Sequence, residues 1–169
     1  MKTLILLLGL YCIVACNRNK EWVGETILIP RNIQIPLYQS IGGAIIDYTI
    51  NDTIKENYPN IYIYKIEGNF AKVIVCVPFD DEISDKTGWI EIKYLGTNLN
   101  NYSDITPIMS EPDEKSTVVF EIKDANWGDL YHVLDAHNKW LKIQNTYNPE
   151  EVGWLAPKYQ CNDPYTTCN

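Results

Sequence analysis

Histidine is scarce in this chain of 169 residues, which contains only His132 and His137. Two imidazoles give little material for a histidine-based metal site or for a nucleophile–histidine pair. Basic residues are outnumbered, at 14 Lys and Arg against 22 Asp and Glu, so the net charge is −8. No two basic residues are adjacent. The chain therefore lacks the positive surface that binds nucleic acid or anionic lipid, and we expect no nucleic-acid partner.

Alanine and methionine are also rare, at 6 and 2 residues, whereas the chain has 22 Ile, 12 Tyr and 9 Val. Few alanines disfavour helices, and β-branched and aromatic side chains suit the half-buried surface of a sheet. Hydrophobic residues make up 46% of the chain, which is enough apolar material for a packed core. The composition therefore predicts an all-β protein.

A long hydrophobic segment is missing too. Lys2 precedes an apolar run of only twelve residues, over positions 4–15, which is too short to cross a bilayer as a helix. A charged start followed by such a run is typical of an export signal. The run ends in Ile-Val-Ala-Cys at residues 13–16, which resembles the bacterial lipobox.

This resemblance implies a cleaved signal peptide over residues 1–15 and lipid attached to Cys16. Asn17 stands where Asp would mark inner-membrane retention, which favours the outer membrane of a bacterial cell envelope. Residues 16–35 then form the anchor, a tether and a possible edge strand. Two alternatives stay open, namely an ordinary signal peptide that happens to contain cysteine and a buried N-terminal strand.

Three cysteines remain after the signal and the lipidation site. Cys161 and Cys168 enclose six residues including a proline, a compact loop that a disulfide can close in an oxidising compartment. We therefore predict a Cys161–Cys168 bridge that holds the C-terminal tail. Cys76 lies in an apolar run, which favours a buried, inert thiol.

Four sequence blocks occur twice in the same order. Residues 36–37, 61–63, 70–73 and 88–94 match residues 107–108, 131–133, 140–143 and 153–159. The offset between copies changes only in loops, where changes of length cost least. The repeat predicts two units, over residues 36–95 and 107–169, joined by a polar linker over residues 96–106. Short alternating segments separated by turn residues predict that each unit is a small barrel.

The second unit carries a series of short motifs. They are Pro107-Ile108, Gly128-Asp129, Trp140-x-Lys142-Ile143, Gly153-Trp154-Leu155 and Tyr159. In this order they resemble the bacterial Src-homology-3 domain family, and the first unit matches the pattern with Phe70 in place of the first Trp. The resemblance implies two tandem Src-homology-3-like barrels and a role in binding cell-wall peptide or a protein partner.

Aromatic residues near the glycines of the last block are candidates for a ligand groove. The resemblance implies a groove formed by Trp154, Pro157 and Tyr159 in the second unit, and by Trp89 and Tyr94 in the first. An equal alternative is that these rings only plug the end of each barrel. The remaining aromatic residues of the repeated blocks, Phe70 and Trp140, are expected in the core.

Two further surface features are candidates for binding. If Ile61 and Ile63 face inward, alternation places Tyr62 and Tyr64 together on the outer face, unless the N-terminal segment or the other barrel covers them. The second feature is an acidic loop with four carboxylates, at Asp80, Asp81, Glu82 and Asp85. A solvated loop is favoured over a calcium site because no Gly-punctuated ligand spacing is present.

The sequence contains no constellation typical of catalysis, metal binding or cofactor binding. We therefore expect a non-catalytic lipoprotein that binds cell-wall peptide or a basic protein partner, needs no cofactor, and contacts the membrane only through its lipid. The alternative is a periplasmic inhibitor or immunity protein that blocks a cell-wall hydrolase or toxin. Many cell-wall hydrolases are basic, and an acidic chain would complement them.

Overall fold

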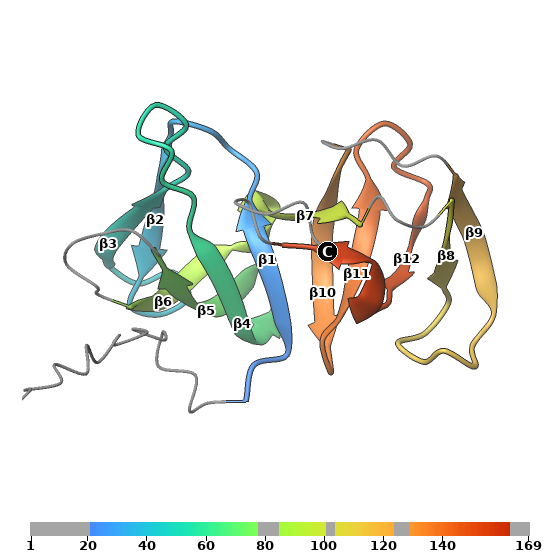
Figure 1. Ribbon diagram of the computed structural model, residues 1–169. Helices are drawn as coiled ribbons and strands as arrows, with labels where there is room; N and C mark the ends of the chain where they lie inside the picture. The colour runs from blue at the N-terminus through green and yellow to red at the C-terminus, as the bar shows by residue number, and fades with distance from the viewer. Residues whose placement is uncertain (1–20, 78–84, 101–103, 124–128, 163–169) are drawn as a thin grey trace, which may run out of the picture.

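The fold is all β, as the composition predicted. The structure is a computed structural model, and it describes residues 21–77, 85–100, 104–123 and 129–162 (Figure 1). Within these ranges, thirteen strands and two single turns of 3-10 helix form, and all the strands join in one antiparallel sheet. No helix in the described part is long and apolar enough to cross a membrane.

Apart from one additional strand at the start of the first half, the elements of the two halves follow the same order. The first half contains β1 (Gly24–Leu28), β2 (Gln34–Tyr38), β3 (Ile45–Ile50), β4 (Asn60–Glu67), β5 (Phe70–Cys76), β6 (Lys86–Glu91), η1 (Ile92–Tyr94) and β7 (Leu95–Leu99). The second half contains β8 (Ile105–Met109), β9 (Val118–Lys123), β10 (Leu130–His137), β11 (Trp140–Asn145), β12 (Val152–Leu155), η2 (Pro157–Tyr159) and β13 (Gln160–Cys161). The repeated sequence blocks therefore fall on equivalent elements.

The two halves also share their irregularities. The pairing of β4 with β5 shifts register between Ile63 and Lys65, and the pairing of β10 with β11 shifts between Val133 and Asp135, 70 residues later. Each unit has a glycine directly before its tryptophan because a neighbouring strand crosses closely there. A Cβ atom at Gly153 would lie 2.5 Å from Ile108 Cγ2, which no side chain could tolerate without a shift.

Strand β7 belongs to both halves, so the predicted polar linker is wrong for residues 96–99. Strand β1 pairs with β4 and β7, and β7 in turn pairs with β10 and β13. Thr26 in β1 and Thr97 in β7 hold equivalent positions, and both are fully buried. The Asn and Thr residues of this segment gave it a polar character, but β7 lies inside the sheet, where its backbone groups are paired.

The predicted edge strand near the N-terminus is likewise an interior strand. Figure 1 shows the two halves side by side, with β1, β7 and β10 between them. Strand β1 has neighbouring strands at both edges, and its alternate residues Gly24, Thr26 and Leu28 are buried because they lie on the face that packs on the core. One continuous apolar core contains buried side chains of both halves, including Ile61, Ile63, Leu141 and Ile143.

Candidate functional site

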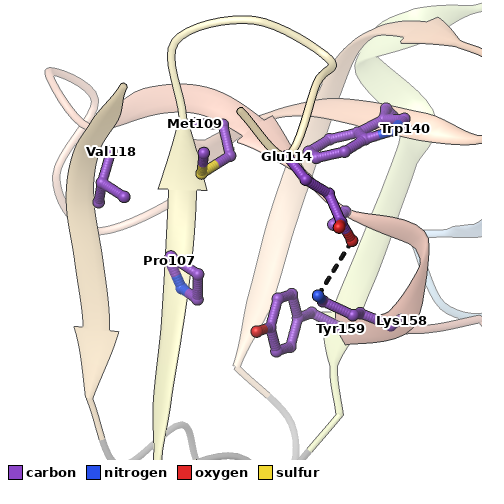
Figure 2. Close-up of a pocket in the computed structure, with 8 residues that line it drawn as sticks. Pro107, Met109, Glu114, Val118, Trp140, Lys158 and Tyr159 are labelled. Carbon is purple, nitrogen blue, oxygen red and sulfur yellow. Dashed lines mark hydrogen bonds and ion pairs between the residues drawn. The ribbon is translucent and has the colours of Figure 1, made fainter. Parts of the chain in front are cut away.

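A groove with a largely apolar lining lies in the second half, and we call it the Trp140 groove. It lies between the β8–β9 hairpin, the start of β11 and η2 (Figure 2), and its volume is about 220 Å³. Its lining residues are Pro107, Met109, Glu114, Val118, Trp140, Ala156, Lys158 and Tyr159. Segments far apart in the sequence therefore form this groove together.

A small hydrophobic cluster lies beneath the Trp140 groove and supplies Met109, Trp140 and Ala156 to its lining. Met109, Trp140, Trp154 and Ala156 are buried together, and Tyr159 packs against both this cluster and the main core. The indole of Trp140 is only 8% exposed, yet it still borders the groove. Strand register brings the cluster together, since Trp154 of β12 lies opposite Met109 of β8.

An ion pair borders the opening of the Trp140 groove. Lys158 Nζ donates a hydrogen bond of 3.0 Å to Glu114 Oε1, which Figure 2 shows as a dashed line, and lies 5.2 Å from the centre of the Tyr159 ring. The hydrogen bond from Lys158 to Glu114 raises the pKa of the lysine, so its charge is retained at neutral pH. Glu114 sits on a loop in which the Ser116 hydroxyl lies 2.8 Å from the Asp113 carbonyl.

The structure divides the groove residues expected from the sequence. Tyr159 lines the Trp140 groove, whereas Trp154 lies outside the lining, in the cluster beneath it, and Pro157 is exposed outside the lining. Trp140, expected only in the core, both packs in the cluster and lines the groove. The sequence did not indicate Met109 or Glu114, because only the hairpin fold carries them to η2. Lys158 could have been found, since it lies within the motif that contains Tyr159.

At the equivalent surface of the first half, different side chains occupy the positions of the groove residues. The Tyr38 and Phe70 rings meet edge to face, with centroids 5.9 Å apart, at the positions that Met109 and Trp140 hold in the second half. Trp89 lies opposite Tyr38 and is half-buried, as is Tyr94. Lys93 lies 4.8 Å from the centre of the Tyr94 ring and forms an ion pair of 2.6 Å with Glu91. Like its counterpart Lys158, it therefore contacts one tyrosine ring and one glutamate.

The predicted exposed patch of two tyrosines is not formed, because Tyr62 is only 3% exposed. Trp22, just before β1, packs on it with a ring separation of 5.6 Å. The N-terminal segment thus covers Tyr62, which was one of the alternatives that the sequence left open. Tyr64 is half-buried, and burial together with the nearby Asp85 carboxylate raises the pKa of its hydroxyl.

The cysteine prediction needs one correction. Cys76 is disulfide-bonded and is not an inert thiol, and Cys161 is also disulfide-bonded. The prediction of a free thiol rested on the apolar surroundings of Cys76, but a buried cysteine can still be bonded to another sulfur. Cys16 and Cys168 lie outside the described residues, as do Asp80, Asp81 and Glu82 of the predicted acidic loop.

The described ranges contain no group of three or more His, Cys, Asp or Glu side chains placed to hold a metal ion. His132 lies on β10, and His137 Nε2 lies 3.0 Å from the side-chain amide of Asn138. Asp85, the described member of the acidic loop, is partly buried beside Tyr64.

Comparison with known proteins adds little to this picture. No family model and no curated protein matches the chain. Among solved structures, the chain is similar to NlpC2 from Trichomonas vaginalis, with 16% sequence identity and a TM-score of 0.33. The match covers 83% of this chain, and the chain spans 49% of that protein. A likeness this weak carries no functional argument.

Proposed function

We propose that this protein is a non-catalytic binding protein that holds a short peptide segment in the Trp140 groove. The observation that carries the proposal is the groove itself, with its aromatic and thioether floor and an ion pair at its opening. A few hot-spot residues, often Trp, Tyr or Arg, supply most of the binding energy in protein interfaces, and a charged rim orients the partner. A peptide provides apolar side chains for the floor and charged groups for Glu114 and Lys158.

The partner that we propose is a cell-wall peptide or an exposed segment of an envelope protein. The resemblance of both sequence units to bacterial Src-homology-3 domains supports this choice, as does the lipobox-like sequence that ends at Cys16. In this proposal the protein is anchored by lipid in a bacterial cell envelope, at the outer membrane. Its second candidate function is inhibition of a basic cell-wall hydrolase or toxin, which the net charge of −8 favours.

Sedimentation with purified peptidoglycan tests the proposal. The chain should pellet with the wall, and Tyr159→Ala should weaken this binding by about tenfold or more, as expected for an aromatic anchor. Tyr48→Ala removes an exposed tyrosine from the first half and is the matched control. If Tyr159→Ala stays folded and binds as well as the original chain, the Trp140 groove is not the binding site.

A parallel experiment separates the two candidate functions. The chain is mixed with a basic lysozyme, and both complex formation and the rate of wall lysis are measured. A wall-binding protein should pellet with peptidoglycan and leave lysis unchanged. An inhibitor should form a complex with the enzyme, slow lysis and stay out of the pellet. Failure of both results would exclude binding to the cell wall and inhibition of this class of hydrolase.

A further inference from the structure

A second pocket lies in the same half of the molecule and shares no lining residue with the Trp140 groove. We call it the acidic pocket. Its volume is about 280 Å³, and it lies between the end of β9, the start of β10 and the end of β11 with the loop that follows. Its lining residues are Glu121, Ile122, Lys123, Asp129, Leu130, Tyr131, Asn145, Tyr147 and Glu151. Three carboxylates thus face one ammonium group.

We propose that the acidic pocket binds the cationic side chain of a lysine or arginine from a protein or peptide partner. A site of this volume suits one side chain, and its carboxylates and tyrosines are the groups that recognise an ammonium or guanidinium ion.

The Glu151 carboxylate is held in place for such a ligand. Its Oε2 accepts a hydrogen bond of 2.8 Å from the Asn145 side chain, and its Oε1 accepts one of 2.9 Å from the Asn148 side chain. Asn145 also accepts a bond from the Tyr147 backbone, which fixes its amide orientation. Each Glu151 oxygen accepts one of these bonds and keeps a lone pair for a further donor.

Tyr131 supplies an observation that is independent of the acidic residues. It is only 4% exposed, and its ring belongs to the main core, yet it lines the acidic pocket. No hydrogen bond to its hydroxyl is found among the described residues. Burial, with the added charge of Asp129 and Glu151, raises the pKa of this hydroxyl to about 12. The hydroxyl is therefore protonated at neutral pH, and its oxygen can accept a hydrogen bond from a cation.

The first half shows that the fold does not require these acids. Repeat offsets place Tyr48, Pro59 and Lys86 at the positions of Glu121, Asp129 and Glu151. Lys86 donates to Asp47 and to the Tyr48 carbonyl instead. The first half thus has a lysine where the second half has Glu151. The fold therefore does not require acidic residues at these positions, and they are specific to the acidic pocket.

Lys123 is the one lining residue that opposes a cationic ligand. Its Nζ lies 4.0 Å from Glu121 Oε2, at the limit of an ion pair, and two thirds of its side chain is exposed. A contact this loose leaves Lys123 free to move away when another cation enters. Its removal should therefore strengthen binding.

The experiment uses the full chain and N-acetyl-lysine N-methylamide as the probe, followed by backbone amide shifts in 1H–15N spectra. We expect saturable shifts at Asn145 and Tyr147. The uncharged N-acetyl-norleucine N-methylamide should cause no saturable shift. Asp129→Asn should weaken binding of the probe by about tenfold, which is the effect of one charge-assisted hydrogen bond. Lys123→Gln should tighten binding, and Glu150→Gln, one residue away from the lining, should change nothing.

Three results would overturn the proposal. Equal shifts with the norleucine compound would show that the pocket holds only an apolar stem. Unchanged binding in a folded Asp129→Asn variant would show that charge is not recognised. Saturable shifts of the same amides with calcium chloride, and none with the lysine probe, would assign the pocket to a metal ion. Because the acidic pocket is separate from the Trp140 groove, none of these results depends on whether peptidoglycan binds.

Discussion

Thr97 Oγ1 lies 2.6 Å from Asn162 Oδ1 in the buried interior, although the two residues are 65 positions apart in the chain. This hydrogen bond joins the strand shared by the two halves to the residue that follows β13. Asn162 in turn donates to the Gln160 side chain at 3.2 Å, so its amide orientation is fixed. The end of the second unit is therefore held to β7 by a buried polar contact.

Removal of the Thr97 hydroxyl should lower the free energy of unfolding. Thr97→Val keeps the shape of the side chain but leaves the buried Asn162 oxygen without its donor, which should cost about 1–3 kcal/mol. Thr26→Val is the matched control, because the Thr26 hydroxyl is buried without a partner in the described structure. That variant should be neutral or more stable. Urea denaturation of both variants measures the contrast, and equal losses would contradict it.

Trp140 and Tyr159 should differ in their contributions to stability. Trp140→Ala empties part of the hydrophobic cluster beneath the groove and should cost about 3–5 kcal/mol. Tyr159→Phe keeps the ring that packs on both clusters, so its unfolding midpoint should stay close to that of the original chain. Thermal and urea melts give both values. A Trp140→Ala variant as stable as the original would show that this cluster contributes little packing energy.

Asp47 should make part of the stability dependent on pH. Its carboxylate accepts the Tyr48 backbone N–H at 2.7 Å and contacts Lys86 at 3.0 Å, and these contacts hold its pKa below the usual value. A lowered pKa in the folded state stabilises the fold at pH values above the unfolded pKa. This stability is lost as pH falls through the folded value.

The comparison with Asp47→Asn tests this effect. At pH 7 the variant should be less stable by less than about 1 kcal/mol, since the ion pair is partly exposed. Below about pH 4 the difference between the two proteins should shrink, because the wild-type carboxylate is then being protonated. Chemical denaturation at pH 7 and pH 3 measures the difference in the free energy of unfolding between the two proteins. A difference that stays constant with pH would exclude a role for ionised Asp47.

Lipid attachment at Cys16 predicts the behaviour of Cys16→Ala in cell fractionation. The original protein should be found with the membranes and should be released by detergent, whereas the variant should be soluble, because the short apolar run alone cannot span a bilayer. Mass spectrometry of the N-terminal peptide should show the added acyl mass. Membrane retention of the variant would contradict lipid anchoring.

Peptide mapping of the non-reduced protein should find both Cys76 and Cys161 in cross-linked peptides. Reduction should lower stability by about 2–4 kcal/mol. The identity of the bonded partners tests the cysteine predictions together. If the signal peptide is removed, Cys16 carries lipid and Cys161 is bonded to Cys168, then no cysteine remains in the monomer to bond Cys76. A free thiol at Cys76 would contradict the structure, and a Cys161–Cys168 link would require Cys76 to bond elsewhere.

Much of the architecture could be predicted because it is encoded by short-range patterns. Alternation at residues 61–63 and 131–133 marks strands with one buried face, and the repeated Gly-Trp pairs mark the places where two strands cross closely. The candidate site was only partly predictable. Tyr159 follows from its motif, but Met109 and Glu114 reach the groove through the β8–β9 hairpin, whose position no local pattern reveals.

The sequence by itself determined the all-β composition, the repeat and the order of elements, since side-chain alternation and turn residues act over a few positions. Only the tertiary structure decided which strands are neighbours. It placed β7 in both halves, because a strand with two open edges can pair on each side whatever the polarity of its side chains. It also buried Tyr62 under Trp22, since alternation separates the two faces of a strand but does not say what covers the outer one.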